Sequence, residues 1–314
     1  MKYISLTNEL VETSAESFLI DFQGEGEVLI VSFGFYDYTS TPSFDFYKQV
    51  KKLEVLSGRK VNKLLLRDVK NQWYLKGIPG LGDNIDSTIK AIRKIIAEMK
   101  PSKVITVGQS MGGYGAILYG LLLGADEVIS YGPLSCFDSK KLEIMHDYRW
   151  MVVVKQLEAN KPVKFYNNLP ELIRNYKSKT PDMRILYGTK PGCLPADRNE
   201  AVNHDVGHAV QFYGLKGVKL YPFHNSSHAI IQYLKINNVI NEIMLNFLFD
   251  TKLVGSSLPG VNAEWQIWLA DNLSQSCALN DLVDVMSSNG FTKETASAAV
   301  ENAQLQYELA EYFQ

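Results

Sequence analysis

Short apolar runs alternate with amphipathic stretches along most of the first 250 positions. The runs that predict buried strands cover residues 18–22, 27–33, 61–66, 104–107, 127–131, 184–187 and 218–221. Runs that are apolar on both faces are typical of parallel strands covered by helices on each side. Helical patterns separate them at 86–100, 113–123, 198–213 and 228–249. This alternation predicts an α/β fold with a mostly parallel sheet flanked by helices.

The alternation stops in two regions. Helical stretches rich in aromatic residues fill residues 137–182, which we expect to form a helical cap insertion above the sheet. Residues 251–262 contain Gly-Ser-Ser-Leu-Pro-Gly, a composition typical of a linker. Beyond it, residues 263–314 follow helical spacing throughout. The sequence therefore predicts a domain over 1–250, a linker over 251–262 and a small all-α module of three helices over 263–314.

The composition restricts the partners and the compartment. Hydrophobic residues make up 46% of the chain, enough to bury a sizeable core. The 32 basic and 34 acidic residues give a net charge of -2, so there is no electrostatic reason to expect nucleic acid or a membrane surface as a partner. The start lacks the apolar core of a signal peptide, and no later run reaches the roughly 18 residues that a membrane span needs. Three cysteines do not make a disulfide framework, and we expect a cytoplasmic protein.

The strongest chemical signal is a serine between two glycines. Gly108 and Gly112 stand two residues before and after Ser110, a buried strand precedes them, and a helix follows from Gly113. A serine hydroxyl needs exposure and orientation to act as a nucleophile, and a strand, a sharp turn and a helix provide both. The glycines permit the tight backbone. The pattern predicts Ser110 as a nucleophile, with a turn used for packing alone as the alternative.

The same segment carries a family resemblance. Gly108-Gln109-Ser110-Met111-Gly112-Gly113-Tyr114-Gly115-Ala116 resembles the nucleophile elbow of the α/β-hydrolase superfamily, and is especially similar to esterases of the esterase-D and feruloyl-esterase type. The resemblance covers about residues 18 to 250. It implies a serine hydrolase whose acid and histidine follow the serine in chain order. It does not imply a substrate, because the superfamily includes esterases, thioesterases, peptidases, acyltransferases and inactive members.

The resemblance places the base after the last predicted strand. His228 lies there, just before a helix, and is the first choice. His224 is close enough to compete, or else it hydrogen-bonds locally within the loop.

The acid is harder to place. Family members often carry an aspartate soon after the glycine that ends the preceding strand, but Gly188-Thr189-Lys190-Pro191-Gly192 contains none. Asp197 is the first acid downstream and is our choice, although it is also a natural helix N-cap. Glu200 and Asp205 remain as alternatives.

An acyl-transfer site also needs two backbone N–H donors for the oxyanion. The family geometry implies Met111 as one donor. The other is expected in the loop after the strand at 28–31, where Phe35 is the candidate and Gly34 the flexible position.

Other side chains are candidates for contacting substrate. Asp68, Trp73 and Tyr74 follow the carboxyl end of a strand, the edge at which α/β sheets bind ligands, or else they pack that loop. Arg149 and Trp150 lie in the predicted cap, where an arginine beside aromatic rings can hold an anionic or sugar group, or form a structural ion pair.

The segment His204-Asp205-Val206-Gly207-His208 has the histidine spacing of a helical zinc site. It lacks the glutamate that metallohydrolases of this kind carry, and Gly207 weakens the helix. We therefore expect helix-surface histidines, and neither a metal nor a cofactor.

The last three predicted helices have the apolar spacing of a packed module. Asn289-Gly290-Phe291 and Tyr307-Glu308-Leu309-Ala310 resemble ubiquitin-associated-like domains. This resemblance implies a protein partner or a tethered substrate carrier.

Together these features predict a serine hydrolase that cleaves an ester or related acyl bond, of a small molecule or a carrier-bound substrate, through an acyl-enzyme. An acyltransferase or an amide or peptide hydrolase with the same triad is one alternative. A non-catalytic binding or scaffold protein is the other.

Overall fold

The computed structural model describes residues 6–37, 39, 42–145, 147–159, 166–190, 204–223, 226–236, 240–249, 261 and 263–312. The candidate acids Asp197 and Glu200 and the alternative base His224 lie outside these ranges. Most of the predicted linker and part of the predicted cap lie outside them as well.

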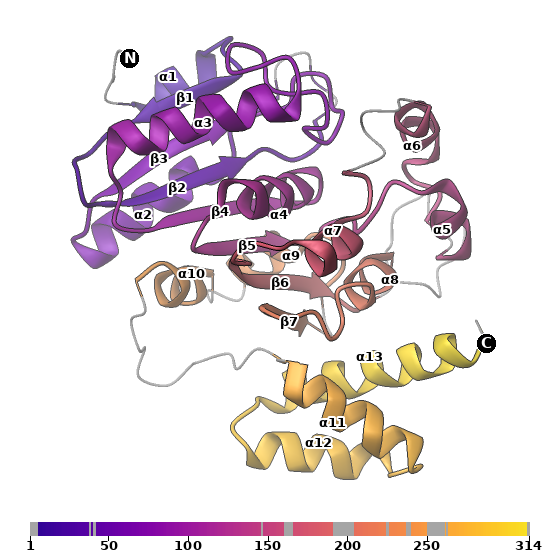
Figure 1. Cartoon of the computed structure of the whole chain (residues 1–314). Helices are drawn as coiled ribbons and strands as arrows, with labels where there is room; N and C mark the ends of the chain where they lie inside the picture. Colours follow the sequence, from indigo (N-terminus) through magenta and orange to yellow (C-terminus); the bar gives the residue numbers. More distant parts are fainter. Residues whose placement is uncertain are drawn as a thin grey trace.

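A seven-stranded sheet forms the centre of the molecule, in the order β1-β3-β2-β4-β5-β6-β7 (Figure 1). The strands are β1 (Phe18–Asp21), β2 (Val28–Phe33), β3 (Val61–Leu66), β4 (Val104–Gln109), β5 (Glu127–Tyr131), β6 (Asp182–Gly188) and β7 (Val218–Phe223). Of these described strands, only β1 runs antiparallel to its neighbour. This arrangement confirms the predicted α/β class and the mostly parallel sheet.

Helices cover both faces of the sheet. One face packs on α3 (Ile85–Met99), α4 (Met111–Leu123), α7 (Leu169–Asn175) and α8 (His204–Val210), and the other on α2 (Tyr47–Ser57), α9 (Ile230–Ile236) and α10 (Ile240–Phe249). Neighbouring residues of a strand point to opposite faces, so Leu29 and Val31 join the first core and Ile30 joins the second. A strand between two cores must be apolar on both sides, which is why the apolar runs are continuous.

Local sequence sets the limits of α3. The Asn84 side chain accepts the N–H of Ser87, and the Ser87 side chain accepts the N–H of Asn84, which together cap the first turn. The helix ends at Lys100 in the left-handed conformation, directly before Pro101. Helices that the sequence patterns did not predict include α1 (Asn8–Thr13) and α2.

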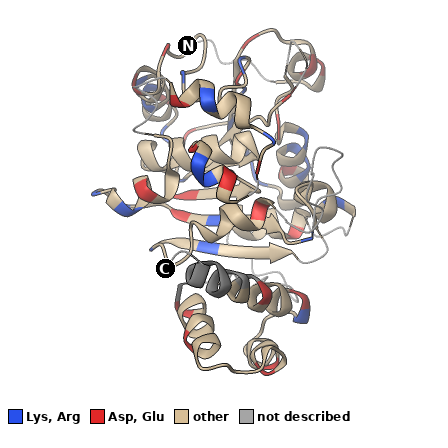
Figure 2. Ribbon diagram, turned by 90° about the vertical axis from the view of Figure 1, so that its right-hand side faces the viewer, with Lys and Arg blue, Asp and Glu red and all other residues tan. Residues whose placement is uncertain are grey.

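The segment between β5 and β6 is helical, as predicted. It contains α5 (Ser139–Ile144), α6 (Met151–Glu158) and α7. Basic and acidic residues are interspersed along the ribbon in Figure 2, in keeping with the balanced charge of the chain. In the described part of the chain, no helix is both long enough and apolar enough to cross a membrane.

Three helices close the chain, α11 (Ala263–Ser274), α12 (Leu279–Ser288) and α13 (Lys293–Tyr312). They share a core of their own, which includes Leu282, Met286 and Phe291. The group lies beside β7 (Figure 1), where Leu220 and Val261 exchange backbone hydrogen bonds. The three helices are therefore confirmed, whereas their independence as a domain stays a prediction.

Candidate active site

Ser110 lies at the sharp turn between β4 and α4. Its backbone has φ 54° and ψ -118°, a conformation that residues with a side chain rarely adopt. A Cβ at Gly108 would collide with the backbone of Gly112, and one at Gly112 would collide with the carbonyl of Phe33 at the end of β2. Both glycines are therefore required by close backbone approach, and Ser110 has the local geometry of a nucleophile elbow.

His228 is paired with a carboxylate. Its Nδ1 lies 2.8 Å and 3.0 Å from the two oxygens of Asp205, which is the second residue of α8. The Asp205 side chain is buried, whereas that of His228 is 27% exposed. Burial alone would raise the pKa of Asp205, but the nearby His228 and Arg149 bring this pKa below its usual value. Asp205 is thus held as a carboxylate against the imidazole.

The end of β5 joins this pair to the serine turn. The Ser110 N–H donates to the Tyr131 carbonyl at 2.8 Å, and Gly132 follows directly. A Cβ on Gly132 would stand 2.9 Å from Asp205 Oδ2 and 3.3 Å from His228 Nδ1. The Gln109 side chain also reaches the His228 carbonyl, at 3.5 Å. Among the described residues no hydrogen bond joins the Ser110 hydroxyl to His228, a bond that in many enzymes tightens only when substrate is present.

Asp205, rather than Asp197, is the carboxylate seen against His228. Asp197 lies outside the described residues, so its role stays untested, as does that of Glu200. The sequence signal for Asp205 was weak, because it lies inside a helix, well beyond the end of β6. Only its place in chain order, between the serine and the histidine, pointed to it.

A second serine, histidine and aspartate lie nearby. Both the hydroxyl and the N–H of Ser135 lie 2.9 Å from His208 Nδ1, and His208 Nε2 lies 3.1 Å from Asp147 Oδ2. A backbone N–H can only donate, so Nδ1 is the acceptor and Nε2 carries the proton toward Asp147. Ser135 is 0% exposed. No sequence pattern pointed to this set, because Ser135 has no flanking glycine turn.

The prediction of surface histidines on α8 was wrong. His204 and His208 are 6% and 1% exposed, because α8 packs against β6 and α13, and His208 bonds to Ser135 and Asp147. In the part of the chain that the structure describes, no three His, Cys, Asp or Glu side chains are grouped so that they could hold a metal ion.

Arg149 connects the two sets. Its guanidinium pairs with both oxygens of Asp147, at 2.9 Å and 2.7 Å, and lies 3.9 Å from Asp205. Burial would raise the pKa of Asp147, but hydrogen bonds from Arg149 and His208 hold it well below its usual value. Of the two roles considered for Arg149, the structure contains the ion pair.

The other residues predicted to contact substrate mostly pack the loop after β3. The Asp68 carboxylate accepts the backbone N–H groups of Lys70, Gln72 and Tyr74. Trp73 and Tyr74 are fully buried, and both have positive φ. Trp150 is partly exposed, and its ring centre lies 5.1 Å from that of Trp73.

The two expected oxyanion donors have different surroundings. Met111 is buried at the first position of α4, where helix N–H groups lack partners within the helix. The Phe35 N–H donates to Asp45 Oδ2 at 2.8 Å. Burial raises the pKa of Asp45 to about 7, although the bond from Phe35 and the charge of Lys235 act in the opposite direction.

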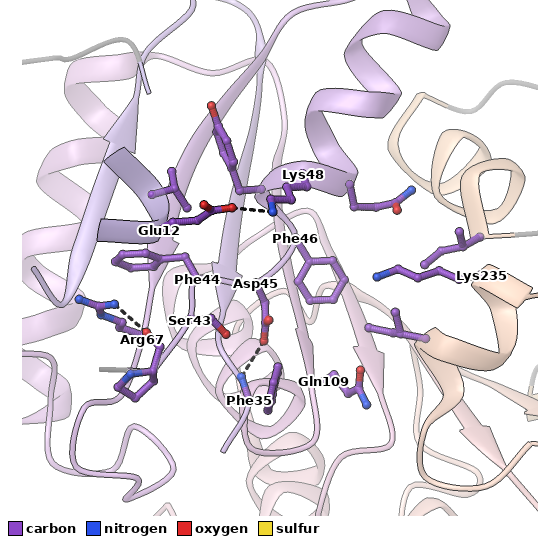
Figure 3. Close-up of a pocket in the computed structure, with 16 residues that line it drawn as sticks. Glu12, Phe35, Ser43, Phe44, Asp45, Phe46, Lys48, Arg67, Gln109 and Lys235 are labelled. Atoms are coloured by element: carbon purple, nitrogen blue, oxygen red, sulfur yellow. Dashed lines mark hydrogen bonds and ion pairs between the residues drawn. The ribbon is translucent and has the colours of Figure 1, made fainter. Parts of the chain in front are cut away.

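A pocket of about 410 Å³ opens next to this bond (Figure 3). We call it the Asp45 pocket. The loop after β2, the residue before Ser110 and the helix after His228 all contribute to its wall. Its lining includes Phe35, Phe44, Asp45, Phe46, Gln109 and Lys235.

Several solved structures share this architecture. Thermogutta terrifontis esterase 2 phosphonylated by sarin is 16% identical with a TM-score of 0.50, over 76% of this chain and 91% of that one. The glycosylation-associated Gap123 complex of Streptococcus agalactiae is 15% identical with a TM-score of 0.51, over 75% of this chain and 45% of that one.

A capsule O-acetyltransferase of Neisseria meningitidis serogroup A in complex with CoA is 16% identical with a TM-score of 0.49, over 71% of this chain and 90% of that one. No family model and no curated protein sequence matches the chain. At these identities the matches speak for the fold alone, and with the strand order they give one conclusion: the chain has the α/β-hydrolase fold.

Proposed function

We propose that the protein is a serine hydrolase that cleaves an ester or related acyl bond, with Ser110 as the nucleophile and His228 as the base. The observation that carries the proposal is the convergence at Gly132, where the His228–Asp205 pair meets the strand end that holds the Ser110 backbone. Asp205 is a positioning residue, since it touches the imidazole rather than the substrate.

The proposed reaction has two halves. Ser110 Oγ bonds to the substrate carbonyl carbon while its proton passes to His228 Nε2, and the carbonyl π electrons move to the oxygen. The intermediate then re-forms the carbonyl and breaks the bond to the leaving group, which takes the proton from His228. Water repeats the sequence on the acyl-enzyme, so that the acid is released and Ser110 regains its proton. Asp205 stabilises the imidazolium formed in each half.

The oxyanion is assigned to the N–H groups of Met111 and Phe35. Loss of one such donor costs about 3 kcal/mol of transition-state stabilisation in enzymes of this type. The helix α4 adds the positive end of its dipole at the same place. For Phe35 to serve, Asp45 must release its N–H.

Ser135 is the second candidate nucleophile, because its hydroxyl lies 2.9 Å from His208. Two observations favour Ser110. Ser135 is 0% exposed against 6% for Ser110, and the N–H of Ser135 already shares the Nδ1 acceptor that a base would use. Ser110 stands at a strained turn at the C-terminal edge of the sheet, where α/β folds bind ligands.

A fluorophosphonate probe tests the assignment. The unmodified protein should be labelled at Ser110, the Ser110→Ala variant should lose the label, and Ser135→Ala should keep it. Thermal melting of each variant checks that the fold is intact. Labelling at Ser135, or none on a folded sample, would contradict the proposal.

Other parts of the hypothesis remain proposals. Transfer of the acyl group to an alcohol or amine in place of water uses the same residues, as does amide cleavage. A non-catalytic scaffold is less well supported, because a buried carboxylate is in contact with His228. We also keep the proposal that residues 263–314 bind a protein partner or carrier.

A further inference from the structure

The Asp45 carboxylate occupies a donor that the proposed reaction needs. Its Oδ2 lies 2.8 Å from the Phe35 N, in the line of the N–H assigned to the oxyanion. Above the raised pKa of Asp45, about 7, this oxygen carries a negative charge and resembles the oxyanion itself. The N–H therefore cannot serve a substrate until Asp45 gives it up.

The backbone of Asp45 is fixed, whereas its carboxylate is held weakly. The Ser32 hydroxyl donates to the Asp45 carbonyl at 3.1 Å, and the next residue, Phe46, begins α2 from the left-handed conformation. The Phe35 N–H is the one hydrogen-bond donor that the described residues supply to the carboxylate. The charge of Lys235 on α9 lowers the pKa of Asp45, and that of Asp37 in the same loop raises it. A ligand that donates to this carboxylate can therefore replace the Phe35 amide.

The Asp45 pocket has a mixed lining. Asp45, Gln109 and Lys235 supply an acceptor, an amide and a cation, and Glu12, Lys48 and Arg67 add further charges to the wall (Figure 3). A long alkyl chain there would strip water from these charges without replacing it. A polyhydroxylated ring suits the lining better, because its hydroxyls can donate and accept while its C–H groups face the exposed Phe35 ring.

We propose that Asp45 makes the enzyme selective for esters of hydroxyl-bearing alcohols, such as sugars and polyols. The alcohol part of the ester lies in the Asp45 pocket, and one of its hydroxyls donates to the Asp45 carboxylate. The carboxylate then leaves the Phe35 N–H, which becomes available to the oxyanion. This inference rests on the proposed function and adds the class of substrate to it.

An ester without hydroxyls gains nothing from this exchange. It must either leave Asp45 on the Phe35 N–H, at the loss of an oxyanion donor, or displace a carboxylate that then has no donor. Each costs a hydrogen bond to a charged group. We expect at least a tenfold difference in kcat/KM between matched esters, since each such loss is of that size.

The test compares two acetate esters on one enzyme. Methyl 6-O-acetyl-glucopyranoside carries ring hydroxyls, and cyclohexylmethyl acetate is its hydroxyl-free counterpart. Both give the same acetyl-enzyme, so kcat/KM reports the acylation half alone. The unmodified protein should prefer the sugar ester.

Asp45→Ala removes both the carboxylate that blocks the Phe35 N–H and the partner of the sugar hydroxyl. It should raise kcat/KM for cyclohexylmethyl acetate about tenfold and lower it for the sugar ester by a similar factor. Asp45→Asn keeps the size and an acceptor oxygen but loses the charge. It should shift both values in the same directions by less, which guards against a folding defect in the first variant.

Asp37→Ala is the matched control. The Asp37 carboxylate accepts the N–H groups of Thr39 and Ser43 in the same loop, but does not bind Phe35. A loosened loop should lower both kcat/KM values together. The inference would be overturned if the kcat/KM values of the two esters changed in the same direction in the Asp45 variants, or did not change, while the fluorophosphonate still labelled Ser110. If the fluorophosphonate did not label Ser110 in the unmodified protein, the proposed function would be overturned, and this inference with it.

Discussion

Gly132 has no room for a side chain. It has φ 52°, and its backbone lies next to the Asp205 carboxylate and the His228 imidazole. A methyl group there would press on Asp205 Oδ2 and on His228 Nδ1, so the hydrogen bond between them must lengthen or turn. A displacement of about 1 Å in a catalytic group can cost on the order of 100-fold in rate.

We therefore expect Gly132→Ala to lower kcat/KM by about 100-fold, measured with the two acetate esters. Gly124→Ala is the control, because Gly124 also has positive φ but a Cβ on it would meet nothing within 4 Å. It should share the cost in stability and keep its activity. Equal activity in the two variants would show that contact at Gly132 does not position the pair.

At the scale of single residues, a glycine turn and chain order predict Ser110 and His228, whose catalytic roles stay predictions. The carboxylate that contacts His228 could not be predicted, since sequence spacing does not say which acid after β6 returns to the imidazole. The contact between Asp45 and the Phe35 N–H was also out of reach. Asp45 has no motif around it, and its position follows from the loop that brings it back to β2.

The helix α8 supplies a member of each serine–histidine–aspartate set. Asp205 binds His228, and three residues later His208 binds Asp147, which the cap arginine Arg149 also holds. Positions three apart lie on neighbouring parts of a helix surface. The helix α8 therefore connects Asp147 and Arg149, in the predicted cap, with the proposed catalytic centre.

Loss of the Asp147 charge should weaken that connection. Asp147→Asn removes the charge that both Arg149 and His208 face, and we expect unfolding in urea at pH 7 to show a loss of about 3 kcal/mol. The pKa of Asp147 is lowered by folding, so its contribution is complete above the unfolded value of about 4 and disappears as pH falls through the folded value. The difference between variant and unmodified protein should thus shrink below about pH 4. Asp284→Asn on the exposed surface of α12 should show neither effect.

At the scale of elements, the strands were predictable because a layer between two cores needs continuous apolar runs. The environment of α8 was not. Its sequence begins His-Asp-Val-Gly-His and is mostly polar there, and burial of polar residues is visible only when their partners in the cap and the sheet are known.

At the scale of the whole molecule, the C-terminal helices are fastened to the sheet by a buried glutamine. The Gln266 side chain accepts the Gly214 N–H at 2.8 Å and donates to the Val261 carbonyl at 2.9 Å. At a second place, Tyr233 of α9 donates to Glu294 of α13 at 2.7 Å. The helix α13 packs against β7, the last strand of the sheet, and Val261 pairs with Leu220 of this strand, which would otherwise present an open edge.

Gln266→Leu should loosen this attachment, because it leaves both backbone groups buried without partners. We expect a loss of about 1–3 kcal/mol in stability and faster hydrogen exchange in β7. Gln275→Leu, at an exposed position after α11, is the control and should change neither. Unchanged exchange in β7 would mean that the helices attach by other contacts. The sequence predicted three helices but not their docking, because the two halves of that interface lie far apart in the chain.

The order of the strands also has a consequence in time. Ser110 follows β4, which pairs with β2 and β5, whereas His228 comes only after β7, the last strand of the sheet to leave the ribosome. Chains fold from the N-terminus as they are made. A growing chain can therefore hold its nucleophile in a finished turn while the base is still unmade. The proposed chemistry can therefore begin only when synthesis of the sheet is complete.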